Sequence, residues 1–215
     1  MRPTIGTRTA ARRRCADDTG TALIEASLAV PIIVALLAGI VDFGMLYERA
    51  NVVYGATHAT ARTLTTAGAS RGADFLALRA FNAGFFTAQS NVTVTKVVIY
   101  KPLAEGSSAP ISATCFSSAT PAATAKCNVY TASMLATLGT SYPTHFGPDA
   151  SSCGTTAWDR NWCPLTRLDQ QDAATDWVGV YVELTYVSVT RLWLRSGVTF
   201  TDRAVMRIEP MPAAS

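Results

Sequence analysis

The chain has 215 residues, which indicates one or two domains, and its hydrophobic content of 49% is ordinary for a folded protein. The formal net charge is +3, but the leader Met1–Gly20 holds five of the 18 basic and two of the 15 acidic residues, so the rest of the chain carries 13 of each. Because no Lys/Arg cluster occurs after the leader, the sequence argues against a nucleic-acid-binding protein.

A hydrophobic run follows the leader, from Thr21 to Val41, and contains one charged residue, Glu25. With about 20 residues, the run is long enough to span a bilayer. The positive-inside rule then keeps the leader arginines in the cytoplasm and sends the rest of the chain across the membrane. Candidate cuts after Ala38, Gly39 or Gly44 place Leu36, Leu37 or Asp42 at the −3 position, where a secretory cleavage site needs a small residue, so an uncleaved span is favoured over a signal peptide.

The acid inside this run predicts an assembly function. A charged side chain in the bilayer core costs about 2.5 to 3.5 kcal/mol on insertion scales, so Glu25 needs a compensating partner there. The alternative places Glu25 at the edge of the membrane, at the level of the lipid headgroups.

One long helix is predicted from about Thr21 to about Thr66, because no strong breaker follows the run and its second half is amphipathic. Residues 21–45 are expected to form the membrane span, and the remainder an amphipathic extension. Pro31 lies inside the span, where it removes one backbone hydrogen bond and predicts a kink.

A turn is predicted at Gly68–Gly72, followed by a second helix at Asp74–Thr87 with Asp74 at its N-cap or in its first turn. Asn91–Tyr100 alternates and is rich in Val and Thr, so it is predicted to be a strand. Near the C-terminus, Val178–Leu192 and Ser196–Ile208 are predicted strands. A turn around Arg195–Gly197 makes them antiparallel neighbours.

The stretch 102–176 lies between these strands and is dominated by Ala, Ser, Thr, Gly and Pro, with a short helix expected at Tyr130–Leu138. It holds every cysteine that follows the span, and these four are Cys115, Cys127, Cys153 and Cys163. Beyond the membrane they lie in an oxidising space, and their even number fits a disulfide framework with three possible pairings. The short loops Cys115–Cys127 and Cys153–Cys163 are favoured, each adding about 2–3 kcal/mol.

The same cysteines do not fit other chemistry. Without a C-x-x-C pair, the spacing argues against a zinc site and against a redox-active pair, so no metal and no cofactor is expected. The two histidines, His58 and His145, are not accompanied by a G-x-S-x-G turn, and an enzyme is not expected. Four aromatic residues near the second cysteine pair form either an exposed binding patch or, more often, the core of a stapled loop; they are Tyr142, Phe146, Trp158 and Trp162.

The predicted architecture is α+β: a long N-terminal helix packs by its second half on a small antiparallel sheet, with a disulfide-stapled insertion. The expected segments are the leader 1–20, the helix 21–66, a helix and strand in 67–101, the insertion 102–176 and a C-terminal β-hairpin in 177–215.

The N-terminal residues resemble a known family. The stretch Gly20–Glu25, then Ser27–Pro31 and Gly39–Gly44, resembles the TadE-like proteins, pseudopilins of the bacterial tight-adherence (Flp pilus) system. The helix end at Ala59–Arg62 and the closing strand Val205–Glu209 are similar too. The resemblance implies a pilin-like fold, cleavage by a prepilin peptidase between Gly20 and Thr21, and pairing of Glu25 with the N-terminal amine of a neighbouring subunit.

A departure from the family pattern is Ala26, since many relatives have an aromatic residue after the acid. The implied function is a non-catalytic minor pilin component. It would sit in the inner membrane with a cytoplasmic N-terminus and a periplasmic or extracellular domain, and enter a surface pilus together with other pilin subunits. The alternatives are a membrane-tethered binding or adhesin module and a membrane-anchored enzyme.

Overall fold

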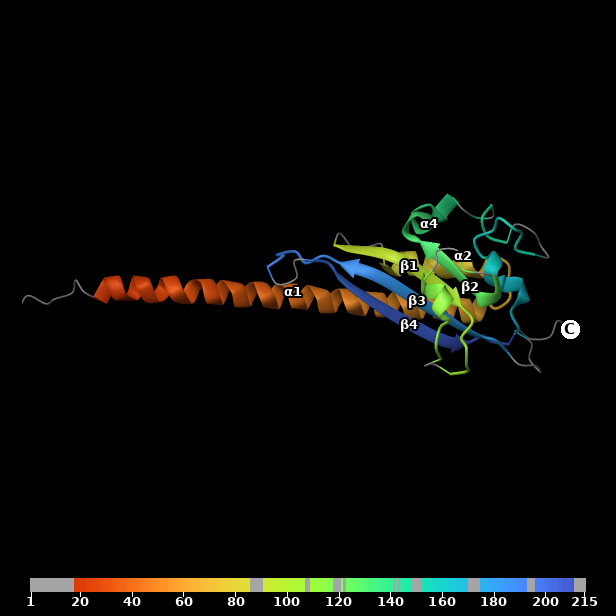
Figure 1. Cartoon of the computed structure of the whole chain (residues 1–215), viewed down its shortest axis with the longest axis horizontal. Coiled ribbons are helices and arrows are strands. Elements are labelled where there is room, and N and C mark those ends of the chain that lie inside the picture. Colours follow the sequence, from red (N-terminus) through yellow and green to blue (C-terminus); the bar gives the residue numbers. More distant parts are fainter. Residues whose placement is uncertain are drawn as a thin grey trace, which may run out of the picture. The chain divides into compact units, whose positions relative to one another are not determined.

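The computed structural model describes residues 18–85, 91–106, 109–117, 121, 123–140, 142, 144–147, 152–169, 175–192 and 196–210 (Figure 1). Most of the predicted leader, the end of the second predicted helix at Thr87 and Arg195 of the predicted turn lie outside these residues. The chain divides into two compact units, Met1–Val41 and Asp42–Ser215.

The described part of the first unit is helical. Helix α1 (Asp18–Ala67) begins there and is continuous through Pro31, and its remaining residues belong to the second unit. From Gly20 onward α1 is long and apolar enough to cross a membrane, by length and composition, with a mean hydropathy of 2.4 in its most apolar window. The predicted long helix is thus confirmed, while the kink at Pro31 stays a prediction.

The second unit begins with α1 residues 42–67, a turn, and helix α2 (Ala73–Phe85). Gly68 and Gly72 adopt φ angles of +54° and +76° in that turn, a backbone region that glycine occupies without steric cost. Gly68 donates its N–H to the Leu64 carbonyl at 3.0 Å, which satisfies one of the last carbonyls of α1.

A four-stranded antiparallel sheet completes the unit, with the order β2-β1-β3-β4. The strands are β1 (Val92–Tyr100), β2 (Cys127–Thr131), β3 (Trp177–Tyr186) and β4 (Val198–Arg207). The predicted hairpin of the last two strands is confirmed, because Tyr186 pairs with Val198 and Trp177 with Arg207. The α+β class is confirmed with it.

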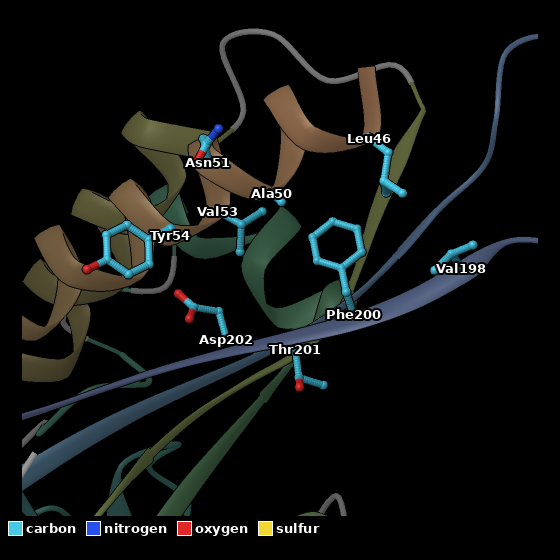
Figure 2. Close-up of a pocket in the computed structure, with 9 residues that line it drawn as sticks. All are labelled: Leu46, Ala50, Asn51, Val53, Tyr54, Val198, Phe200, Thr201 and Asp202. Atoms are coloured by element: carbon cyan, nitrogen blue, oxygen red, sulfur yellow. The ribbon is translucent and has the colours of Figure 1, made fainter. Parts of the chain in front are cut away.

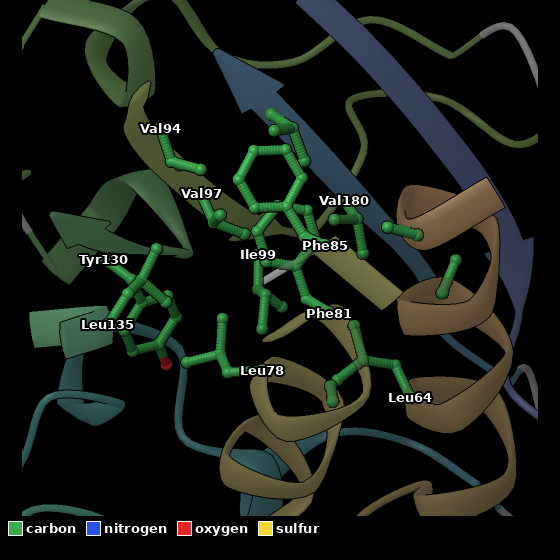
Figure 3. Close-up of a cluster of buried hydrophobic side chains, with 14 of the residues drawn as sticks. Leu64, Leu78, Phe81, Phe85, Val94, Val97, Ile99, Tyr130, Leu135 and Val180 are labelled. Atoms are coloured by element: carbon green, nitrogen blue, oxygen red, sulfur yellow. The ribbon is translucent and has the colours of Figure 1, made fainter. Parts of the chain in front are cut away.

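The main core lies between the helices and one face of this sheet (Figure 3). Leu64 of α1 and Leu78, Phe81 and Phe85 of α2 are at most 1% exposed. The alternate residues of β3 that face them are apolar, and these are Val178, Val180, Val182, Leu184 and Tyr186. Burying such side chains stabilises the fold by about 1.5–3 kcal/mol each, so the amphipathic half of α1 is part of a globular core.

The opposite face of the sheet is covered by the start of the insertion. Val98, Tyr100 and Val129 point to this face, where Ile111 and the Cys115–Cys127 disulfide pack on them. Tyr100 lies across its strand partner Gly179, and a Cβ at Gly179 would fall 2.2 Å from the Tyr100 ring. The sheet is therefore buried on both faces along much of β1 and β2, whereas Thr201 and Arg203 on the outer face of β4 stay exposed.

Two predictions near the insertion need correction. Tyr130 does not begin a helix: it lies in β2, which pairs with β1, and only Ala132–Ala136 (α4) and the 3-10 turn Leu138–Thr140 are helical. Strand β3 ends at Tyr186 and does not reach Leu192; beyond it, the amide of Thr190 is bonded to the Asp42 carboxylate of α1 and not to a strand. In both places tertiary partners override the local pattern.

Candidate functional site

The residues of the expected processing and assembly site lie near the start of α1. Gly20, Thr21 and Glu25 are helical and exposed. Thr21 and Glu25 are four residues apart, so they share one helix face and lie about 6 Å apart along the axis. Among the described residues, Glu25 takes part in none of the three ion pairs, which are Lys96–Glu183, Lys101–Asp176 and Arg167–Asp74.

The surface around Glu25 is apolar. Large hydrophobic side chains of residues 23–41 are 46–72% exposed, and they are Leu23, Ile24, Leu28, Val30, Ile32, Ile33, Val34, Leu36, Leu37, Ile40 and Val41. A soluble surface rarely carries an apolar patch of this extent. The segment therefore requires a lipid or protein environment, and Glu25 is its single acid.

Pro31 lies one turn after a serine. Because proline has no N–H, the carbonyl of Ser27 lacks its usual helical donor. The hydroxyl of Ser27 turns back to the Ile24 carbonyl at 2.7 Å. The Ser27 hydroxyl therefore has a partner within its own helix, as a lipid environment requires.

Asp42 marks the end of the uncharged stretch. Its side chain is fully buried, although it is the first acid after Glu25. It accepts a hydrogen bond from the backbone N–H of Thr190 at 3.2 Å and another from the Thr190 hydroxyl. Asp42 thus joins α1 to the loop that connects β3 with β4. This contact was not predicted from the sequence.

A groove of about 460 Å³ runs between the extension of α1 and the first residues of β4 (Figure 2). Figure 2 shows Phe200 and Asp202 pointing from β4 toward the helix, where Val53 and Tyr54 face the same space. One Asp202 carboxylate oxygen is buried and has no hydrogen-bond partner among the described residues. The groove is an apolar hollow beside the edge strand with one acid in its wall.

A buried ion pair holds the insertion to α2. Asp74 and Arg167 are both fully buried, with 2.6 Å between a carboxylate oxygen of Asp74 and Nη2 of Arg167. The other Asp74 oxygen accepts hydrogen bonds from Asn128 at 2.8 Å and Tyr130 at 2.7 Å. The Arg167 guanidinium stacks on the Trp162 ring at 4.3 Å. Such a network is costly to break by removing one member.

The pKa values of two neighbouring groups, Tyr130 and Asp159, are raised beside this ion-pair network. Burial, together with the charges of Asp74 and Asp159, holds the pKa of Tyr130 well above its usual value. Burial, helped by the charge of Asp74, raises the pKa of Asp159 from 3.8 to about 6. Asp159 accepts one hydrogen bond, from the Gly147 N–H at 3.3 Å. The sequence had predicted Asp74 in the first turn of the second helix, which is confirmed, but not its partner Arg167, which lies 93 residues away.

The two disulfides of the structure are Cys115–Cys127 and Cys153–Cys163, which is the pairing expected from loop length. The first lies in the cluster on the outer face of the sheet, and the second has its own small cluster with Ala157. Three of the four aromatic residues beside the second disulfide belong to the main core or pack against it, and these are Phe146, Trp158 and Trp162. Tyr142 is 42% exposed and stacks on Phe75.

The two histidines make ring contacts. His58 packs on Tyr54 with 4.1 Å between ring centroids, and His145 stacks on Trp158 at 4.7 Å. Both contacts are those of packing residues, as the sequence reasoning expected for His58.

Comparison with known proteins gives one match. Residues 20–62 match the family described as TadE-like protein, so the resemblance of the N-terminal segment to this family is confirmed. The matched segment includes Gly20, Glu25 and Pro31 and ends before the sheet. No curated protein and no solved structure matches the chain. TadE-like proteins are components of tight-adherence pili and are not known as enzymes.

Proposed function

We propose that this chain is a minor, non-catalytic pseudopilin of a bacterial tight-adherence (Flp) pilus. Residues 21–41 anchor it in the inner membrane, with the leader in the cytoplasm and the unit Asp42–Ser215 on the other side. Its partners are a prepilin peptidase, which cuts between Gly20 and Thr21, and other pilin subunits. The observation that carries this proposal is Glu25, an exposed acid that forms no ion pair with any described residue and lies in an otherwise apolar helical surface.

Processing supplies the missing partner of Glu25. Cleavage after Gly20 turns Thr21 into an N-terminal ammonium group and removes the five leader arginines. A neighbouring copy whose helix is displaced by about 6 Å along the axis brings this ammonium level with Glu25. The pair neutralises a charge that lipid disfavours, and it forms only between processed subunits.

The direct test is the N-terminus of the mature protein, isolated from membranes of its own host. We expect sequencing to begin at Thr21, and we expect Gly20→Ala to leave the full-length, slower-migrating form. A mature protein that begins at Met1, or a Gly20→Ala variant of unchanged mobility, contradicts the proposal.

Assembly is tested separately. Glu25→Ala is expected to abolish incorporation into pili or piliation itself, whereas Glu48→Ala, which removes an exposed acid from the same helix beyond the run, is expected to leave it intact. His145→Ala serves as a second control, because an enzyme that used His145 would lose function while a pseudopilin would not. Equal effects of Glu25→Ala and Glu48→Ala would contradict the assembly role.

A second candidate function is a membrane-tethered binding module. It is favoured by a hollow of about 340 Å³ in the insertion beside the Cys153–Cys163 disulfide, lined by Lys101, Lys126, Arg160 and Asp176. If this hollow binds a surface ligand, adhesion of cells carrying the full-length protein should fall on reduction and with Lys126→Glu. It should not change with Lys96→Glu, because Lys96 does not line the hollow.

A further inference from the structure

The loop between β3 and β4 combines exposed apolar side chains with a rigid attachment. We define the β3–β4 tip as residues 188–192, at the end of the hairpin where Tyr186 pairs with Val198. Val189 and Leu192 are 52% and 57% exposed, and Arg191 between them is exposed as well. Two large apolar residues and a cation thus face outward on a short loop.

The tip is held in a defined conformation. The hydroxyl of buried Ser188 accepts the N–H of Arg191 at 3.2 Å, and the hydroxyl of Thr190 accepts the N–H of Leu192 at 3.3 Å. Arg191 adopts a φ of +54°, which is uncommon for a residue with a side chain and persists where surrounding contacts impose it. These contacts hold the backbone around Val189 and Leu192, whose side chains are exposed.

The attachment also fixes the position of the tip along α1, at Asp42. Thr190 is hydrogen-bonded to Asp42 through its N–H and its hydroxyl. Asp42 directly follows the uncharged stretch Ala26–Val41, so the tip contacts α1 within one residue, about 1.5 Å along the axis, of the end of that stretch. Phe43, the next residue, is 54% exposed. Where the apolar stretch leaves a bilayer, the tip lies at the bilayer surface.

We propose that the β3–β4 tip inserts into the headgroup region of an anionic bilayer and holds the second unit against the membrane from which α1 emerges. This rests on the proposed membrane anchoring by residues 21–41. Val189, Leu192 and Phe43 enter the boundary between headgroups and acyl chains, which accepts apolar and aromatic side chains. Arg191 meets lipid phosphates, while Asp42, the acid that contacts the tip, is buried and hydrogen-bonded to Thr190.

A second protein is a poorer occupant of this surface. A stable interface between proteins buries at least about 1,000 Å² in total, and the tip offers two apolar side chains and an arginine. A bilayer accepts so small an insertion because the transmembrane helix already supplies the attachment.

The test uses the full-length protein, reconstituted in vesicles of phosphatidylcholine with or without phosphatidylglycerol. An environment-sensitive fluorescent amino acid replaces Leu192 in one sample, Leu36 of the apolar stretch in a second and Leu103 in a third. Leu103 is the matched control, a 67% exposed leucine that follows β1 at the opposite end of the sheet. Lipids brominated on the acyl chains quench fluorophores within the bilayer, and iodide quenches those in water.

We expect lipid bromines to quench the probes at positions 36 and 192 strongly and the probe at 103 not at all. Phosphatidylglycerol should deepen quenching at 192, and Arg191→Glu should remove that gain. Quenching at 36 with a probe at 192 that only iodide reaches would overturn the tip proposal and leave the anchor standing. A probe at 192 that neither quencher reaches would assign the tip to a protein partner and also overturn it. Absence of lipid quenching at 36 would contradict the membrane anchor, and the tip proposal would fall with it.

Discussion

The two units of this chain differ in whether their apolar and acidic side chains are exposed or buried. The described part of the first unit, residues 18–41, exposes its large apolar side chains and carries an exposed acid, Glu25. The second unit has a buried apolar core, and it also buries two acids with partners, Asp42 with Thr190 and Asp74 with Arg167. The first unit therefore exposes groups that need a lipid or protein environment, whereas the second has a core and buried ion-pair and hydrogen-bond contacts of its own.

Removing one member of the buried ion pair tests the self-sufficiency of the second unit most severely. Asp74→Ala leaves Arg167 buried without its carboxylate, and we expect a loss of about 3–5 kcal/mol in the free energy of unfolding. Chemical denaturation of the full-length protein in detergent micelles, followed by tryptophan fluorescence, measures it. Glu105→Ala, at an exposed acid in the same unit, should change the stability by no more than about 0.5 kcal/mol. Equal stability of the two variants would show that the ion pair is dispensable.

The same substitution in the two parts of α1 should have different consequences. Leu64→Ala empties a fully buried position in the core and should cost about 2–5 kcal/mol of the stability of the second unit. Leu36→Ala changes a 59% exposed side chain of the first unit and should leave the denaturation midpoint of the second unit unchanged. A midpoint that falls equally in both variants would mean that the two units unfold as one.

A charge placed in the apolar stretch tests the dependence of the first unit on lipid. Leu36→Arg should oppose membrane insertion by about 2.5–3.5 kcal/mol, so more of the protein should be extracted from membranes by alkaline carbonate. Tyr47→Arg, at a 72% exposed position of the same helix beyond Asp42, should not increase extraction. If both variants remain in the membrane fraction, the stretch is not the anchor.

Titration gives the smallest expected effect and concerns the second unit alone. The pKa of Asp159 is raised from 3.8 to about 6 by burial, so the folded protein binds more protons than the unfolded chain between about pH 4 and 6. Stability should therefore fall as the pH rises through this window, by less than about 3 kcal/mol. Asp159→Asn should flatten the dependence in denaturation curves recorded across that range. If the stability of this variant still falls by the same amount between about pH 4 and 6, another group is responsible for the pH dependence.

Local sequence patterns were sufficient for the regular elements. The uncharged run and the amphipathic stretch after it predicted α1, since helix formation and membrane insertion depend on residues that are close in sequence. The alternating Val and Thr residues predicted β1 and the final hairpin for the same reason. Short loops between cysteines led to the disulfide pairing, because a short loop brings its own ends together.

The edge strand β2 was not predicted from the sequence. Its five residues Cys127–Thr131 are too few for a periodic signal. The strand forms because it pairs with the edge of β1, and this pairing places Tyr130 in the main core. The residues after Tyr186 were expected to be strand, but Thr190 there bonds to Asp42, 148 residues away, and not to a neighbouring strand. Pairings over such separations leave no mark in the local pattern.

The sequence by itself determined which stretch is apolar enough to cross a membrane and that Glu25 is the acid within it, because both follow from consecutive residues and their transfer free energies. The expected cleavage after Gly20 is implied by the resemblance of the same residues to the TadE-like proteins. Only the tertiary structure decided that Arg167 neutralises Asp74 and that Asp42 holds the β3–β4 tip. These contacts join segments 93 and 148 residues apart, and folding alone brings them together.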